Sequence, residues 1–516
     1  MSPWQRLAAW LLISLGLEAV AYFLSWWYAP GRIASLPLFF LFTFVAWFSA
    51  IRMIANWFAL AHVARPRHRP PVPGLAVDVI TTAAPGEPME IFRTTLPAMV
   101  QIRYPHATYL LDDSHRDELR TLSEELGIRY IRRDTPGKGG KAGNVNHGLA
   151  LASGEFVAIF DPDHVPSPEF LDRILGYFDD PGVGFVQAAQ AYRNQCDSLV
   201  ARGAAEQTYE LYGPTLMGLH GLGAPLLFGC HTTFRRAALD SIGGYAIHNA
   251  EDLRTCMRLY ARKWKGEYVP EILARGLAPA DLVVFLRQQY RWAHSVFDLF
   301  FRDYWRLLRR WTFYQGAAFF AVGTYYFVGT AILISLVLPL IFLGTGWGAV
   351  TSTTQSFLAH LAPLILVNFA IRRFAQRFLL SREERGWHLA GTVMLFASCF
   401  AHAAGLIAAL RNVRVPYIVT AKGGSFSPGL THVRLHALGA GVSSAAVLYS
   451  LWVGQPAEGW FLQICAVWNA SMMGAIVWIA VDQAGGQNRD ARLAGQQNPS
   501  VRGLADHPVV GNRSGC

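Results

Sequence analysis

The sequence predicts a mixed α/β domain set between two groups of membrane-spanning helices. Two observations predict this fold class. First, 52% of the residues are hydrophobic and only 16% are charged, whereas about a quarter of the residues in a soluble domain carry charge. Second, short apolar runs alternate with amphipathic segments between about residues 75 and 275, which is typical of strands and helices that alternate in a parallel sheet.

Two long apolar runs open the chain, near residues 7–28 and 36–61. Each is long enough to cross a hydrocarbon layer of about 30 Å at about 1.5 Å per residue. Arginines alternate through residues 65–69 directly after the second run, and arginine-rich loops favour the cytoplasmic side of a membrane. We therefore expect residues 1–62 to form two N-terminal transmembrane helices. The net charge of +10 fits the same bias, and no basic helix or RNA motif indicates a nucleic-acid partner.

The α/β region begins with four predicted strands, each followed by a predicted helix. The strands are residues 77–80, 108–111, 130–131 and 156–160, and the helices are residues 88–101, 115–126, 141–152 and 168–178. In sheets of this kind, ligands bind at the carboxyl ends of the strands. Two of the strands run directly into acidic residues, so we expect the chemistry of the protein at that edge.

Apolar runs return after residue 312. They lie near residues 314–343, 355–373, 387–410, 435–454 and 459–482. Arginines on both sides of residues 387–410 favour an interfacial or re-entrant helix there over a crossing one. The count is then six spans, two before the α/β region and four after it; seven spans is the alternative, which would place Lys422 outside. The residues after 482 are rich in Gly, Gln, Asn and Arg and predict a disordered tail.

Two acidic clusters follow predicted strands, Asp112-Asp113-Ser114 and Asp161-Pro162-Asp163-His164. Carboxylates at positions i and i+2 of a strand end can hold a divalent cation and a diphosphate together, because Mg²⁺ takes oxygen ligands and keeps phosphate oxygens in its shell. Acidic residues in such turns are also common turn formers. Because two clusters stand at successive strand ends, we favour a metal and phosphate site.

Two further motifs carry charge. Lys141 lies in the glycine-rich stretch 137–144, where backbone amides and an ammonium group suit a phosphate. Glu251 and Asp252 precede a predicted helix. A carboxylate at that position either caps the helix or serves as the base that removes a proton from an acceptor hydroxyl.

The next motif is QQYRW, residues 288–292. A tryptophan face suits stacking on a sugar and an arginine suits a diphosphate, although an Arg-Trp pair is also a common membrane anchor. The ordered set of an acidic pair, Lys-Ala-Gly-Asn, DxDH, Glu-Asp and QxxRW resembles the processive family-2 glycosyltransferases of the bacterial cellulose synthase type. The DxDH form looks more like cellulose and curdlan synthases than hyaluronan or chitin synthases. Residues 417–423 are similar to the FxVTxK gating loop of cellulose synthase.

This resemblance implies a GT-A-like glycosyltransferase domain and a role for each matching residue. Asp252 is implied as the general base, with Gln288, Arg291 and Trp292 holding UDP and the acceptor sugar. The implied ligands of Mg²⁺ (or Mn²⁺) are Asp161, Asp163 and His164. The residues implied to bind the UDP-sugar are Glu87, Asp112, Asp113, Lys141, Asp161, Thr420 and Lys422.

Three positions depart from the family pattern. Residues 81–87 (TTAAPGE) stand where the family usually has a nucleotide-binding segment written near TYNE, and Ala250 replaces the usual threonine before Glu-Asp. Phe228-Gly229-Cys230 replaces the usual Cys-Gly-Ser beside the acceptor. The last departure predicts an altered fit of the acceptor, and with it of the sugar or the linkage.

The resemblance further implies an inverting, processive enzyme of the bacterial inner membrane that polymerises a β-linked glycan and translocates it. UDP-glucose, giving a β-glucan, is the first choice of substrate and UDP-N-acetylglucosamine the next. The alternative is a non-processive enzyme that adds one sugar to a lipid acceptor. The implied partners are the UDP-sugar, the growing polysaccharide, the lipid bilayer and periplasmic accessory proteins. The implied domain order is residues 1–62, a cytoplasmic domain 63–311, a transmembrane region 312–482 with interface helix 387–410 and gating loop 416–430, and a cytoplasmic tail 483–516.

Overall fold

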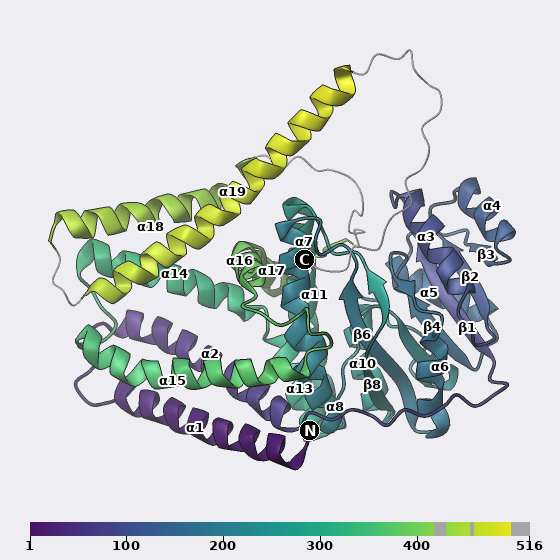
Figure 1. Cartoon of the computed structure of the whole chain (residues 1–516), viewed down its shortest axis with the longest axis horizontal. Helices are drawn as coiled ribbons and strands as arrows, with labels where there is room; N and C mark the ends of the chain where they lie inside the picture. The colour runs from purple at the N-terminus through teal and green to yellow at the C-terminus, as the bar shows by residue number, and fades with distance from the viewer. Residues whose placement is uncertain (417–429, 455–458, 497–516) are drawn as a thin grey trace.

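The computed structural model describes residues 1–416, 430–454 and 459–496. A mixed α/β domain lies on one side of the molecule and long apolar helices lie on the other, as the sequence predicts (Figure 1). The predicted gating-loop residues Thr420 and Lys422 lie outside the described residues.

The domain is built on one eight-stranded sheet in the order β3-β2-β1-β4-β7-β6-β8-β5. The strands are β1 (Val77–Ala83), β2 (Ala107–Asp112), β3 (Arg129–Arg132), β4 (Phe156–Phe160), β5 (Val165–Pro166), β6 (Val183–Tyr192), β7 (Thr232–Arg235) and β8 (Lys265–Gly276). The first four strands predicted from the sequence pair in parallel, with β1 in contact with both β2 and β4. Their carboxyl ends therefore share one edge, and β7 is antiparallel to β4.

Both faces of the central strands are buried, which explains why they are apolar without a break. Side chains alternate along a strand, so Phe156, Ala158 and Phe160 enter the core on one face of β4, and Val157 and Ile159 enter the core on the other. The first face is covered by α3 (Met89–Val100), α4 (Asp117–Glu125) and α6 (Phe170–Ile174).

The second core continues from the sheet into the apolar helices. It includes residues of α5 (Gly140–Leu151) and α10 (Glu251–Ala261), and also residues of α2 (Leu36–Ala61), α11 (Leu282–Leu299) and α13 (Phe313–Gly323). Helix α11 accordingly lies between the sheet and the long helices (Figure 1). A rigid packed core thus links the two halves of the molecule.

Within the described parts of the chain, six helices are long and apolar enough to cross a membrane. They are α1 (Pro3–Trp27), α2, α14 (Phe327–Thr345), α15 (Thr354–Ala375), α18 (Arg434–Trp452) and α19 (Trp460–Gln496). These helices are called the bundle below. The carboxyl ends of α1, α14 and α18 lie at the end of the bundle farthest from the sheet (Figure 1). Loop residues Ile33 and Val350 pair there as a β-bridge, so the α1–α2 and α14–α15 loops meet on the same side.

The helix expected at residues 387–410 is a bent pair. Helices α16 (Leu389–Ala397) and α17 (Cys399–Leu410) meet at an angle of 43°, and the pair counts as a seventh candidate span only if taken together. Helix α16 packs on α7 (Leu199–Glu210) and α17 packs on α11. A Cβ at Gly405 would lie 2.9 Å from the backbone nitrogen of His294, so only glycine permits this close crossing of α17 and α11.

Two expected boundaries differ in the structure. The apolar run 314–343 forms two helices, because α13 ends at Gly323 and α14 begins at Phe327. Arg52 of α2 stabilises this break, donating to the Ala321 carbonyl at 2.9 Å and stacking over Tyr325. Helix α19 extends to Gln496, beyond residue 483, where the sequence predicted the start of a disordered tail.

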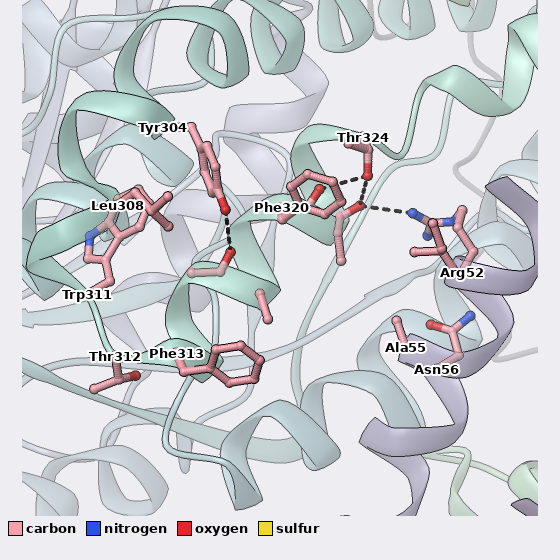
Figure 2. A pocket seen from close by; sticks show the side chains of 14 residues that line it. Arg52, Ala55, Asn56, Tyr304, Leu308, Trp311, Thr312, Phe313, Phe320 and Thr324 are labelled. Atoms are coloured by element: carbon pink, nitrogen blue, oxygen red, sulfur yellow. Dashed lines mark hydrogen bonds between the residues drawn. The ribbon is translucent and has the colours of Figure 1, made fainter. Parts of the chain in front are cut away.

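A pocket of about 430 Å³ lies between α2 and α13 (Figure 2). Its walls include Arg52, Asn56, Trp311 and Phe320. Of the residues that the sequence assigns to substrate or metal, those that the structure describes do not line it. The candidate site lies instead at the carboxyl edge of the sheet.

Candidate active site

Acidic side chains accept hydrogen bonds from backbone amides within the turns after β1 and β2. The carboxylate of Glu87 accepts from the Ala84 amide at 2.8 Å, and its carbonyl accepts from Arg116 at 2.8 Å. Asp112 is fully buried and accepts from the Ser114 amide at 2.7 Å and the Tyr130 hydroxyl at 2.8 Å. These carboxylates therefore hold the loops at the carboxyl edge of the sheet, and a direct contact of either one with UDP stays a prediction.

Asp113 forms a buried ion pair with Arg133. Both carboxylate oxygens accept from the guanidinium at 2.5 Å, and one of them also accepts from the Gly137 amide at 3.1 Å. Arg133 in turn donates to the Lys138 carbonyl at 2.7 Å. The pair thus fixes the glycine-rich loop that leads into α5. Arg133 belongs to none of the sequence motifs, so no local pattern indicates this role.

Lys141 joins three of the predicted motifs. It lies in the first turn of α5, where its ammonium forms an ion pair with Asp161 and donates to the Gly229 carbonyl at 3.2 Å. The same ammonium lies 3.8 Å from the carboxylate of Glu251. Asn144 orients α5 by donating to the carbonyl of Leu111 at the end of β2, at 2.8 Å. Asn144 was not assigned a role from the sequence, although it is part of the Lys-Ala-Gly-Asn motif.

The predicted metal ligands lie together directly after β4. One ligand atom from each of Asp161, Asp163 and His164 falls within 4.8 Å of the others. Asp163 is held by the Leu277 amide at 2.8 Å, and its second oxygen lies 3.3 Å from Nδ1 of His164. Two carboxylates and an imidazole suit Mg²⁺ or Mn²⁺. The residues present therefore fit the metal that the resemblance implies.

The candidate base, Asp252, lies in the first turn of α10. One of its oxygens accepts from the Leu253 amide at 2.7 Å, and the other would lie 3.4 Å from a Cβ at Gly229. Burial raises the pKa of Asp252. Burial also raises the pKa of Glu251 to about 7, although the nearby ammonium of Lys141 acts in the opposite direction. Both carboxylates are therefore stronger bases than exposed ones.

Gly229 allows the loop opposite Asp252 to approach closely. Its φ of 46° lies in the left-handed region that favours glycine. Gln187 of β6 holds both sides of this loop, because its side chain accepts from the Phe228 amide at 3.1 Å and donates to the Cys230 carbonyl at 3.2 Å. Gln187 is far from the loop along the chain, so no sequence motif predicts this contact.

The QxxRW residues lie on α11, which Asp281 caps by accepting from two backbone amides of the first turn. Gln288, Arg291 and Trp292 are half-buried and, at positions i, i+3 and i+4, share one face of the helix. Trp292 packs against the core that joins the sheet to the apolar helices. This face therefore lies at the junction between the α/β domain and the bundle.

The chain that leaves α17 is fixed beside the same edge. Asn249 donates to the Val415 carbonyl at 2.7 Å, and His294 of α11 donates to the Val413 carbonyl at 2.9 Å. Residues 413–415 therefore lie between the loop that precedes Glu251 and the QxxRW helix. The sequence had assigned neither Asn249 nor His294, and their partners are too distant in sequence for a local pattern to reveal.

Known proteins match both the catalytic motifs and the bundle. Residues 73–295 match the model "Glycosyltransferase like family 2", and residues 240–432 match the model "Cellulose synthase". The chain is 34% identical over 247 residues to the cellulose synthase catalytic subunit [UDP-forming] of Xanthomonas axonopodis pv. citri, covering 45% of this chain and 34% of that protein. It is 28% identical over 380 residues to the corresponding subunit of Pseudomonas fluorescens, covering 69% of this chain and 50% of that protein.

The fold is similar to that of a solved mannosyltransferase, PcManGT from Pyrobaculum calidifontis, whose structure holds GDP-Man and Mn²⁺. The TM-score is 0.50 at 16% identity, over 73% of this chain and all of that one. The α/β domain is accordingly GT-A-like, and apolar helices flank it.

The chain belongs to the family-2 glycosyltransferases of the bacterial cellulose synthase type. The predicted family is thereby confirmed, while the curdlan synthases receive no specific support. The matched stretch spans half or less of the length of the two relatives described.

Proposed function

We propose that this protein is an inverting, processive glycosyltransferase that polymerises a β-linked glycan from a UDP-sugar and passes it through its own helices. The observation that carries the proposal is the position of Lys141, which contacts Asp161 and lies 3.8 Å from Glu251. This lysine brings the phosphate, metal and base motifs into one site. The site adjoins the QxxRW helix, which lies against the bundle.

The reaction would be a direct displacement at the anomeric carbon. Asp252 accepts the proton of the acceptor hydroxyl as the hydroxyl oxygen forms its bond to that carbon. The bond between the anomeric carbon and the diphosphate oxygen breaks, and its electron pair leaves with UDP. Attack from the face opposite to UDP converts an α-linked donor into a β-linkage.

The remaining residues would stabilise the leaving group and orient the acceptor. Lys141 and Arg291 supply positive charge to the diphosphate in a site from which water is largely excluded. Asp161, Asp163 and His164 would hold Mg²⁺ or Mn²⁺, which when bound supplies further positive charge to the diphosphate. Trp292 offers a flat apolar face to the acceptor sugar.

The proposed orientation places the α/β domain in the cytoplasm of a bacterium, with six spans in the inner membrane. The paired loops around Ile33 and Val350 support it, because two loops on the same side require α1 and α14 to cross in the same direction. The bent pair packs on α7 and α11, which belong to the site side of the molecule, and also on the candidate spans α14 and α19; we place it at the interface between the two.

UDP-glucose is the proposed substrate and UDP-N-acetylglucosamine the second choice. The test is to incubate purified protein in lipid nanodiscs with Mg²⁺ and each of a panel of radiolabelled UDP-sugars, and to digest the product with linkage-specific glycanases. The proposal predicts one labelled polymer that a β-glucanase degrades. A product bearing a single sugar on a lipid would establish the non-processive alternative instead.

A further inference from the structure

Three side chains that are distant in sequence meet beside the candidate Mg²⁺ ligands. His164 follows β4, while Cys230 and His231 immediately precede β7. All three are buried, with exposed fractions of 3%, 2% and 0%. One sulfur or ring nitrogen from each lies within 4.8 Å of the others, and the two imidazole centroids are 5.2 Å apart.

The two ring nitrogens of His231 have different surroundings. Its Nε2 donates to the Ala189 carbonyl of β6 at 3.1 Å, so its proton lies on that nitrogen in the neutral ring. Among the described residues, Nδ1 of His231 is buried and has no hydrogen-bond partner. A backbone carbonyl that holds one ring nitrogen is the usual support for an imidazole that binds metal through the other. The backbone at His231 has a φ of 38°, in the left-handed region that is costly for a residue other than glycine.

The donor set differs in chemistry from the neighbouring carboxylates. Thiolate and imidazole select Zn²⁺ and similar borderline-soft cations, whereas carboxylates select Mg²⁺ or Mn²⁺. A tetrahedral zinc ion with bonds of about 2.0–2.3 Å separates its ligand atoms by roughly 3.5 Å. The three side chains would therefore need to close by at most about 1.3 Å, and a water or substrate atom would complete the tetrahedron.

We propose that Cys230, His164 and His231 form a second cation site, specific for a thiophilic divalent ion such as Zn²⁺. His164 belongs both to this set and to the set with Asp161 and Asp163. A cation in the second site therefore removes a ligand from the first and places an additional positive charge beside it. Binding would displace the thiol proton of Cys230 to solvent. Zinc would then inhibit the metal-supported reaction, and excess Mg²⁺ would oppose the inhibition.

The primary test uses Co²⁺ as a spectroscopic substitute for Zn²⁺ and needs no enzymatic activity. Full-length protein in nanodiscs is titrated with Co²⁺, and the sulfur-to-cobalt charge-transfer absorption is recorded. The site predicts a saturable band at one equivalent that Zn²⁺ displaces. The band should be absent in Cys230→Ser and retained in Cys256→Ser, a matched change at another buried, free cysteine. No band in the wild type, or an unchanged band in Cys230→Ser, would overturn the proposal.

A second variant protects the test against misfolding of Cys230→Ser. In His231→Gln the thiol remains but one ligand is lost, and we expect Zn²⁺ affinity to fall at least about tenfold. Unchanged affinity in a His231→Gln protein that binds UDP normally would contradict the proposed ligand set. Asp163→Asn, which removes a carboxylate of the first set but keeps the three proposed ligands of the second, should keep the cobalt band.

The inhibition rests on the proposed function and is measured separately. The assay uses the UDP-sugar that supports synthesis, and inhibition is expressed as a fraction of each protein's own Mg²⁺-supported rate. The Zn²⁺ concentration for half inhibition should be at least about tenfold higher in Cys230→Ser than in the wild type. An unchanged value would contradict competition at His164. If no sugar is transferred at all, the proposed function fails while the cobalt titration still decides the cation site.

Discussion

The ammonium of Lys141 lies 3.8 Å from the carboxylate of Glu251 and is also paired with Asp161. The three residues belong to motifs that are widely separated in sequence, and their meeting places the proposed phosphate-binding lysine beside the Glu-Asp motif that contains the proposed base. Because Asp252 is adjacent to Glu251, the charge of Lys141 affects both the leaving group and the carboxylates that control the acceptor proton.

Asp252→Asn should abolish glycan synthesis while leaving UDP binding intact. The amide is nearly isosteric with the carboxylate but cannot accept the hydroxyl proton in the transition state. Incorporation of labelled sugar and the Kd for UDP are measured on the same preparation. Synthesis at more than a few per cent of the wild-type rate would exclude Asp252 as the base.

Removal of Lys141 should cost transition-state stabilisation. In Lys141→Met we expect kcat/KM for the UDP-sugar to fall by about 100- to 1,000-fold, the loss typical of one preorganised donor to a developing charge. Lys138→Met is the matched control, because Lys138 lies in the same loop and is exposed. Equal losses in the two variants would show that general loop charge, and not the position of Lys141, matters.

The rate of sugar transfer should change with pH in a range above that in which an exposed carboxylate ionises. Burial raises the pKa of Asp252 and raises that of Glu251 to about 7. A raised pKa means that the carboxylates are still protonated at pH values where exposed ones are ionised. A pH profile of kcat/KM should therefore fall on the acid side with a midpoint above about 4, the ordinary value for aspartate.

Lys141→Met should move that acid limb to higher pH. The ammonium favours the ionised form of Glu251 and lowers its pKa, so its loss lets burial raise the pKa further. The profile is compared with that of Lys138→Met. An acid limb that stays in place would show that the titrating group is not coupled to Lys141.

Asp113 should contribute to the stability of the fold as well as to substrate binding. Breaking a buried ion pair costs roughly 3–5 kcal/mol because one charge is left without its partner. Asp113→Asn and Arg133→Gln should therefore both lower Tm without any ligand present, whereas Arg132→Gln, at an exposed neighbour, should not. If Asp113→Asn keeps its Tm and loses only UDP affinity, the carboxylate acts on the nucleotide and not on the loop.

A reporter inserted at residue 425 separates six spans from seven. The proposed orientation places that position in the cytoplasm, because the bent pair α16–α17 stays on the site side of the membrane. A phosphatase fusion, active only outside the cytoplasm, should therefore be inactive there and active when fused at residue 349. Activity at residue 425 would make the bent pair a true span.

Local patterns predicted the parts of the fold that depend on neighbouring residues. Continuous apolar runs predicted β1, β2 and β4, because these strands are buried on both faces, and the length of the longer apolar runs predicted the six long helices. The break between α13 and α14 was missed because it depends on Arg52, which reaches Ala321 from a different helix.

In the candidate site, too, contacts between residues distant in sequence could not be predicted from local patterns. Motifs identified its charged residues, but they did not show that Asp112 and Asp113 are occupied by internal donors such as Tyr130 and Arg133. These partners lie on β3 or directly after it and become neighbours only when the sheet forms. Asn249 and His294 were missed for the same reason, since each binds a carbonyl that is distant in the chain.

Processive synthesis is tested most directly by the length of the products when very little substrate has been consumed. Purified protein in nanodiscs receives a trace of radiolabelled UDP-glucose with Mg²⁺, and the reaction is stopped after less than one sugar per enzyme has been transferred. Processive polymerisation by a single site predicts that the label is already in long β-glucan chains while most enzymes carry no product. Label confined to single sugars or to short chains distributed over all enzymes would contradict it.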